Sequence, residues 1–226
     1  MARKLLILVG SPRRDGNTVT LAQAVQRGAE ATGAQVALRI LDDYVSSFLR
    51  DCRTCRQQSG ECTIPDRYRA LFFEDFLSSD SVVLCSPIYW YGLSGQAKSF
   101  LDRSFCYYAA SYPGSKEVLT SMSGKRIGLV LASEETYPGA ALGIIHQIQE
   151  FARYTHSKFI GVVRGVGNSR GDVRNDPGRP IASAESLGAE IFSHAYSDYR
   201  LDSARKAQVW PFTCHSQSTA PGTTCE

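Results

Sequence analysis

Residues 10–18 gather side chains that donate hydrogen bonds to anions. The segment reads Gly-Ser-Pro-Arg-Arg-Asp-Gly-Asn-Thr and directly follows a short apolar run at residues 4–9. Hydroxyl, amide and guanidinium groups bind phosphate oxygens, and a glycine lets the backbone approach a ligand closely. A helix that starts at the end of this segment adds free amides and a favourable dipole. The segment therefore predicts a phosphate-binding loop with these ligands: Ser11, Arg13, Gly16, Asn17 and Thr18.

This loop differs from two common nucleotide-binding loops. It lacks the pattern G-x-x-x-x-G-K-[ST], which excludes a P-loop for Mg-ATP, and it lacks G-x-G-x-x-G, although Asp42 and Asp43 lie where a ribose-binding acid would stand. Its Arg14 is a second candidate for the charge that binds an anion. The simpler alternative is a helix cap of Ser, Thr and Asn beside a charged turn. Both interpretations stay open on this segment alone.

A second segment, residues 86–98, suits a flat aromatic ligand. It contains three adjacent aromatic residues between a proline and a glycine. A planar ring system binds well to aromatic faces and to closely packed backbone. The alternative is that these aromatic residues lie at the surface or in a protein interface. The expected ligand contacts are Pro87, Ile88, Tyr89, Trp90, Tyr91 and Gly92.

The elements that must position these segments alternate between strand and helix. Apolar strands are expected at 4–9, 35–41, 82–84, 125–132 and 159–163, and helices at 18–31, 67–78, 96–105, 140–155 and 181–199. This alternation predicts a parallel sheet with helices on both faces, whose ligand lies beyond the carboxyl ends of the strands. Ser133, at the end of the fourth strand, joins the expected site, and Glu134, Glu135 and Tyr137 follow it at the rim or serve only to keep the loop soluble.

The two motifs together resemble the NADPH-dependent FMN reductase family, especially the flavodoxin-like branch that includes iron–sulfur flavoproteins. The resemblance covers about residues 3–200, and the segment 171–176 supports it. It implies an α/β, flavodoxin-like three-layer sandwich with a five-stranded parallel sheet of order 2-1-3-4-5. It also implies bound FMN, with the loop after the third strand around the isoalloxazine ring, and NADPH or NADH as electron donor. Arg13, Arg14 and Arg170 are candidates for a nucleotide 2′-phosphate.

The cysteine pattern departs from that of the iron–sulfur branch. Cys52, Cys55 and Cys62 match three positions of the family's set of four, but the remaining position falls near Gln57 or Gln58. A [4Fe–4S] cluster normally takes four thiolates. We therefore expect no metal and unliganded thiols. Zinc held by three cysteines and a redox pair formed by Cys52 and Cys55 remain as alternatives.

Length and charge limit the remaining classes of protein. The 226 residues suit one FMN-binding domain at 1–205 and a tail at 206–226 without periodicity, and the net charge of only +3 argues against nucleic-acid binding. Neither a membrane helix nor a signal peptide is evident, so we expect a cytoplasmic protein. Aromatic residues that follow the helix expected at 96–105 suggest an apolar patch at the contact of a homodimer. They are Tyr107, Tyr108 and Tyr112.

These observations predict an FMN-dependent oxidoreductase. Hydride would pass from NAD(P)H through the bound FMN to a quinone, a flavin or another small acceptor, and no catalytic side chain is assigned because the cofactor carries the chemistry. One alternative is an FMN-binding electron carrier that never meets a nicotinamide directly. Another is a flavin-dependent tailoring enzyme for an aromatic metabolite.

Overall fold

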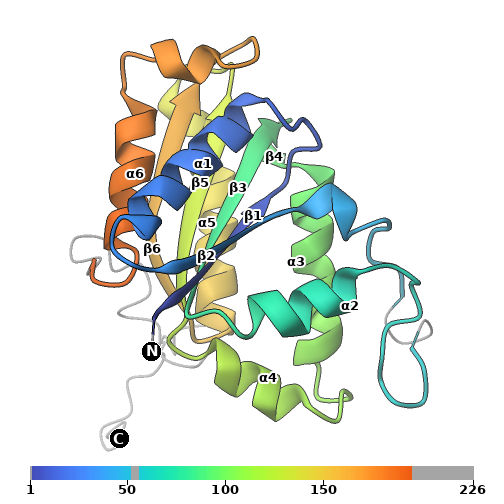
Figure 1. The fold of residues 1–226 in the computed structure, drawn as a ribbon. Coiled ribbons are helices and arrows are strands. Elements are labelled where there is room, and N and C mark those ends of the chain that lie inside the picture. The colour runs from blue at the N-terminus through green and yellow to red at the C-terminus, as the bar shows by residue number, and fades with distance from the viewer. Residues whose placement is uncertain (1, 52–55, 195–226) are drawn as a thin grey trace, which may run out of the picture. The chain divides into compact units, whose positions relative to one another are not determined.

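Five parallel strands form the centre of the computed structural model, which describes residues 2–51 and 56–194 (Figure 1). They are β1 (Lys4–Val9), β2 (Gln35–Ile40), β3 (Ser81–Tyr89), β5 (Arg126–Ser133) and β6 (Lys158–Val166). Across the sheet they lie in the order β2-β1-β3-β5-β6, so the first to fifth parallel strands have the predicted order. The short antiparallel strand β4 (Gly92–Leu93), which pairs with the end of β3, was not predicted.

Helices cover both faces of the sheet, as Figure 1 shows. They are α1 (Asn17–Glu30), α2 (Tyr68–Ala70), α3 (Gly95–Tyr108), α4 (Ser115–Met122), α5 (Leu142–Tyr154) and α6 (Pro180–Glu190). Helix α2 continues as a π-helical turn over Leu71–Phe76. Buried side chains of α1 and α6 pack on one face, and those of α2 to α5 pack on the other. This arrangement is the three-layer α/β architecture expected from the sequence.

Alternation along the strands divides the core into two halves. In β1, Leu6 and Leu8 face the layer of α3 and α5, whereas Leu5, Ile7 and Val9 face the layer of α1 and α6. Successive side chains of a strand point to opposite faces, and a strand covered by helices on both sides is therefore apolar throughout. This explains why the central strands were the easiest elements to predict.

Helices α1 and α6 touch through their backbones. A Cβ atom on Gly28 would lie 1.9 Å from the carbonyl oxygen of Glu185, and one on Gly188 would lie 2.1 Å from that of Val25. Such distances are far below any real carbon–oxygen contact, so both positions require glycine. The contact fixes α6, and with it the loop that precedes α6, against the helix that follows β1.

The tyrosines expected at an exposed patch are mostly inside the molecule. Tyr107 is 0% exposed and Tyr108 is 5% exposed, and only Tyr112 is partly accessible. Helix α3 extends to Tyr108, beyond its predicted end, and α4 was not predicted. The ring of Tyr107 therefore stacks on that of Phe72 with centroids 4.9 Å apart. The prediction that Tyr107 and Tyr108 form an exposed interface patch is wrong.

A buried ion pair anchors the loop that leads into α2. Arg103 of α3 donates two hydrogen bonds to Asp66, at 2.5 and 2.8 Å, and both side chains are buried. Burial by itself would raise the pKa of Asp66. The hydrogen bonds from Arg103 and from the amides of Ser46 and Tyr68 outweigh burial and hold that pKa below its ordinary value. The carboxylate is thus charged at neutral pH.

The structure describes only one of the three cysteines that were predicted to be unliganded thiols. Cys52 and Cys55 lie outside the described residues, whereas Cys62 is half-buried and Cys85 and Cys106 are buried. Within residues 2–51 and 56–194, no three His, Cys, Asp or Glu side chains are grouped as metal ligands. The absence of metal stays a prediction, because two of the three cysteines in question are not described. The proposed tail, 206–226, and the end of the predicted helix at 181–199 also lie outside.

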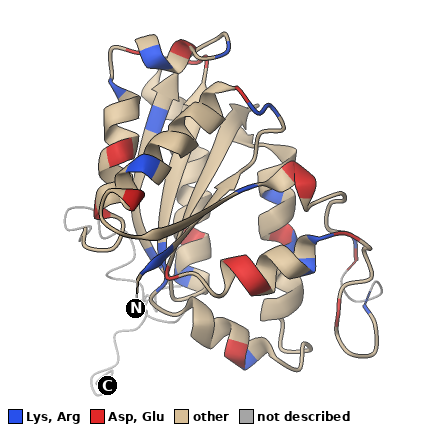
Figure 2. Cartoon of the chain, viewed as in Figure 1, with Lys and Arg blue, Asp and Glu red and all other residues tan. Residues whose placement is uncertain are grey.

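Charged residues of both signs are interspersed over the elements visible in Figure 2. This distribution agrees with the small net charge of +3. None of the described helices has the length and apolar character needed to cross a membrane.

Candidate functional site

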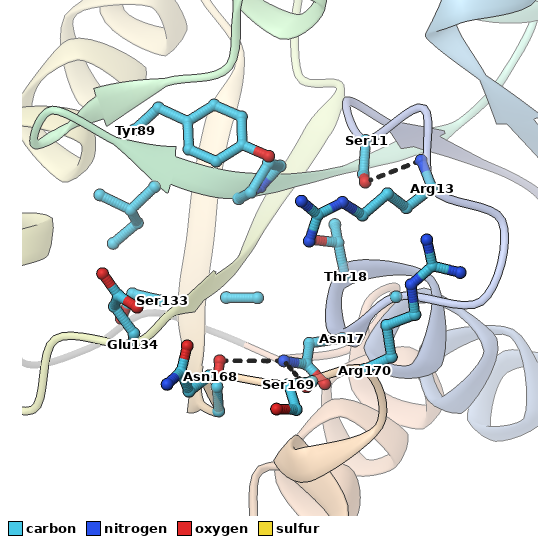
Figure 3. Close-up of a pocket in the computed structure, with 15 residues that line it drawn as sticks. Ser11, Arg13, Asn17, Thr18, Tyr89, Ser133, Glu134, Asn168, Ser169 and Arg170 are labelled. Carbon is cyan, nitrogen blue, oxygen red and sulfur yellow. Dashed lines mark hydrogen bonds between the residues drawn. The ribbon is translucent and has the colours of Figure 1, made fainter.

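A cleft of about 340 Å³ lies at the carboxyl ends of β1, β3, β5 and β6 (Figure 3). This volume falls within the range of roughly 300–1,000 Å³ that is usual for small-molecule sites. The cleft is lined by Ser11, Arg13, Gly16, Asn17, Thr18, Pro87, Ile88, Tyr89, Ala132, Ser133, Glu134, Gly167, Asn168, Ser169 and Arg170. The structure thus brings together the predicted phosphate loop, the first part of the predicted aromatic loop and Ser133.

The N-terminus of α1 borders this cleft without a side-chain cap. Gly16 is the N-cap residue, its backbone is extended, and it provides no side-chain cap hydrogen bond. The hydroxyl of Ser11 instead accepts a hydrogen bond from the amide of Arg13, at 3.2 Å. The helix-cap alternative therefore does not describe this segment. Uncapped amides and the helix dipole provide a positive end toward which an anion is attracted.

The three arginines predicted as anion ligands have different partners. Arg14 forms an ion pair with Asp43 at 2.6 Å, and this contact raises the pKa of Arg14. Arg170 forms an ion pair with Asp15 at 2.7 Å, and its hydrogen bonds lower the pKa of Asp15. Arg13 extends its guanidinium toward the middle of the cleft (Figure 3) and has no carboxylate partner among the described residues. Arg13 is consequently the side chain best placed to bind an anion.

Asn17 lines the cleft but uses its side chain elsewhere. Its Nδ2 atom donates to the carbonyl oxygens of Gly167 and Ser169, each at 3.0 Å, and its Oδ1 atom accepts from the amide of Val173 at 3.3 Å. Its amide group therefore anchors the loop after β6, and its donors are not available for a phosphate group. The neighbouring Thr18 is buried at the wall of the cleft.

Buried serines connect the two predicted ligand loops. Ser94 caps α3 by accepting from the amide of Ala97, and its hydroxyl donates to the carbonyl oxygen of Gly10 at 2.7 Å. The hydroxyl of Ser86 accepts from the amide of Ser94 at 3.0 Å. A Cβ atom on Gly10 would lie only 2.6 Å from the Ser94 hydroxyl, so the two loops approach this closely because residue 10 is glycine.

The three adjacent aromatic residues end in an exposed two-residue turn. Tyr89 lines the cleft, whereas Trp90 and Tyr91 form the turn between β3 and β4, with φ angles of +49° and +57°. Positive φ at both central residues is typical of a type I′ hairpin, which usually takes Asn-Gly. Trp90 is 96% exposed and Tyr91 is 50% exposed. The predicted contacts Trp90, Tyr91 and Gly92, which we call the aromatic hairpin, therefore lie outside the cleft lining.

The loop after β6 supplies residues that the sequence analysis did not assign to the site. Gly167, Asn168 and Ser169 line the cleft, and Arg170 does so from the same loop. The available signal was the position of this Gly- and Asn-rich loop, because the fifth parallel strand ends at the same sheet edge as the others. Ala132 and Glu134 complete the lining beside Ser133.

Comparisons with known proteins agree with this fold. Residues 3–177 match the sequence model of the family described as having a flavodoxin-like fold. A protein of Bacillus subtilis named as an NAD(P)H-dependent FMN-containing oxidoreductase is 28% identical over 76% of this chain and 90% of its own length. An iron–sulfur flavoprotein of Methanocaldococcus jannaschii is 30% identical over 83% of this chain and 95% of its own length.

One solved structure supports the same conclusion for the architecture alone. The NAD(P)H:quinone oxidoreductase from Methanothermobacter marburgensis superposes with a TM-score of 0.66 over 87% of this chain and 100% of that one, at 17% identity. The strand order, the cleft at the carboxyl ends and the match over residues 3–177 lead to one assignment. The chain belongs to the flavodoxin-like family whose members include NAD(P)H-dependent FMN oxidoreductases and iron–sulfur flavoproteins.

Proposed function

We propose that this chain is an FMN-dependent oxidoreductase that takes hydride from NADPH or NADH and delivers it to a quinone, a flavin or another small acceptor. One observation carries the proposal. The cleft joins an uncapped helix N-terminus and the guanidinium of Arg13, which forms no ion pair within the described residues, to the ring of Tyr89. An anion site next to an aromatic side chain suits a ring system that carries a phosphate.

The residues present fit FMN. Ser11, Arg13 and Thr18, with the amides at the start of α1, would hold its phosphate group, and residues 87–89 and 132–134 would contact its ring. FMN supplies the hydride chemistry when it is bound, and the protein supplies orientation and electrostatics. Arg13 neutralises charge at the phosphate end, while the serine network of Ser86 and Ser94 sets the spacing between the two loops.

The named relatives support the same reaction class. The Bacillus subtilis relative is named for NAD(P)H and FMN, and this chain covers 90% of it. An electron carrier that docks on a partner protein favours a strongly charged surface. The small net charge and the interspersed charges of this chain do not favour such a surface.

The test is anaerobic mixing of purified protein with NADPH and, separately, with NADH in a stopped-flow spectrometer. We expect a yellow protein that releases FMN rather than FAD, and bleaching of its visible flavin bands within seconds by one of the two nicotinamides. Reoxidation by a quinone or by free flavin then identifies the acceptor class. A flavin that neither nicotinamide bleaches on this timescale, but that a partner reductase does bleach, would establish the carrier instead.

A further inference from the structure

The loop after β5, residues 134–137, contributes Glu134 to the cleft lining and Tyr137 to a contact with the aromatic hairpin, and a side chain of the neighbouring strand holds it. Arg164 of β6 donates from Nη1 to the carbonyl oxygen of Tyr137 at 2.7 Å and from Nη2 to that of Glu135. Its Nε atom faces the hydroxyl of Ser133 at 3.4 Å. One guanidinium group thus contacts three residues of the loop and its strand, a geometry that a planar fork of donors allows.

The clamped loop in turn contacts the hairpin. The rings of Tyr137 and Tyr91 lie with their centroids 6.2 Å apart. The negative charge of Glu135, followed by the nearby Tyr137, raises the pKa of the Tyr91 phenol. Tyr91 has a positive φ, which a bulky residue adopts only when its surroundings stabilise that conformation. Tyr137 meets its ring and Glu135 acts on its phenol, so the loop 134–137 supports this side of the hairpin.

We infer that Arg164 is a positioning residue for the acceptor: through the loop 134–137 it holds Tyr91 and the aromatic hairpin at the mouth of the cleft. The inference rests on the proposed function, because it assumes that the second substrate docks at this mouth. Arg164 does not line the cleft itself. Its effect on a substrate must therefore pass through the loop, whose Glu134 does line the cleft.

The chain offers a matched control for a purely structural clamp. Arg126, at the start of β5, donates from Nε to the carbonyl oxygen of Ile191 and from Nη2 to that of His194. It is the same kind of clamp, an arginine on a strand that holds backbone carbonyl groups of a following segment. It stands at the opposite end of the strand from Ser133 and the cleft. Arg126→Met removes comparable bonds and should leave the hairpin as it is.

The first experiment is hydrogen–deuterium exchange on the full chain without flavin. We expect Arg164→Met to speed exchange in peptides over residues 88–93 and 133–142 by about 10-fold, because the loop loses its fixed hydrogen bonds. Arg126→Met should speed exchange near residues 189–194 instead. Unchanged exchange at 88–93 in Arg164→Met, or equal acceleration there in both variants, would overturn the inference. Arg164→Lys keeps the charge but not the fork of donors, and we expect it to give an intermediate rate of exchange. This variant provides the test if Arg164→Met folds poorly.

The second experiment compares steady-state and rapid kinetics of the flavin-loaded variants. We expect Arg164→Met to raise the KM for a quinone acceptor by about 5–10-fold while the affinity for FMN and the rate of bleaching by the nicotinamide stay within about two-fold. An unchanged KM, or a parallel loss of FMN affinity, would contradict positioning of the acceptor. If the wild-type protein is not bleached by either nicotinamide, the proposed function fails, whereas the exchange experiment still tests Arg164.

Discussion

Arg13 and Arg14 are adjacent in the chain, but their side chains have different surroundings. Arg14 is neutralised by Asp43, whereas Arg13 faces the cleft and forms no ion pair in the part of the chain that the structure describes. We expect Arg13→Ala to weaken FMN binding by roughly 1.5–3 kcal/mol, the usual contribution of a hydrogen bond to a charged group. Arg14→Ala, the matched control, should leave the affinity nearly unchanged because exposed ion pairs contribute little. Fluorescence titration of FMN measures both, and equal losses in the two variants would refute the assignment of Arg13.

Asn17 gives the opposite case, a residue whose type suits phosphate but whose contacts are internal. Asn17→Ala should lower the free energy of unfolding of the flavin-free protein by about 1–3 kcal/mol, because two carbonyl groups and an amide that follow β6 lose their partners. Asn17→Asp should lower it further, since it places an acceptor against the carbonyl oxygens of Gly167 and Ser169. Urea unfolding without FMN measures this. Full stability of both variants, with FMN affinity reduced, would restore Asn17 as a direct ligand.

For individual residues, the sequence predicted which side chains line the cleft but not which contacts they make. Ser11, Arg13, Gly16 and Thr18 line the cleft as predicted, because a loop after β1 must end at the carboxyl edge of the sheet. The role of Asn17 depends on residues 150 to 156 positions away in the chain. No local pattern can distinguish such a tertiary anchor from a free amide donor.

The buried pair of Arg103 and Asp66 ties the loop before α2 to α3. Asp66→Asn should cost about 3–5 kcal/mol of stability at pH 7, since it leaves the buried guanidinium without a countercharge. Asp43→Asn, which breaks the exposed pair with Arg14, is the control and should have little effect. Because folding lowers the pKa of Asp66, its stabilising contribution is complete above the ordinary pKa of about 3.9 and disappears as the pH falls through the lowered value.

The measurement is urea unfolding of the wild type and both variants between pH 7 and pH 2.5. The difference between wild type and Asp66→Asn should shrink toward the acid end, where the native carboxyl group is protonated as well. A difference that does not change with pH would show that lost packing, rather than charge, causes the destabilisation.

The aromatic hairpin is an element whose sequence opposes its backbone. Type I′ turns favour Asn-Gly, and here the two turn positions hold Trp90 and Tyr91 at positive φ. The double substitution Trp90→Asn and Tyr91→Gly should raise the melting temperature by roughly a few degrees, because it removes this strain. It should also lower kcat/KM for aromatic acceptors, while FMN stays bound. A loss of stability in thermal unfolding would mean that the aromatic contacts outweigh the strain.

The sequence predicts elements with a long apolar pattern well. It does not predict short elements, or ends of elements, that form because of tertiary contacts. The run Lys4–Val9 and the helix after it were predicted to within a residue, since continuous apolarity and helical periodicity are strong local signals. Helix α4, over Ser115–Met122, carries few apolar residues in a short span and was missed. Tyr107 and Tyr108 were placed at the surface because the turn of α3 that buries them lies beyond its predicted end.

The oligomeric state of the whole molecule does not follow from its family or from its strand order, and it has to be measured. The homodimer was predicted from the patch of Tyr107, Tyr108 and Tyr112 and from the resemblance, which implies that dimers are common in the family. Only the resemblance still supports it fully, because Tyr107 and Tyr108 lie in the core. Light scattering at micromolar concentration should give about twice the mass of 24.8 kDa. A monomer at that concentration would withdraw the prediction without affecting the assignment of the cleft, whose lining comes from one chain.

Two walls of the cleft come from segments about 150 residues apart in the chain, the loop after β1 and the loop after β6, and this has a consequence for the order of folding. Hydrogen bonds of Asn17 and the ion pair of Asp15 and Arg170 close contacts between residues 150 to 156 positions apart. Because closing such long loops costs entropy before the contacts form, we expect these closures to follow the pairing of the central strands. The phosphate end of the cleft is then incomplete until β6 has joined the sheet. A nascent chain whose loop after β6 has not yet emerged from the ribosome should consequently bind no FMN. The cofactor should then bind last and stabilise the finished fold, without guiding its formation.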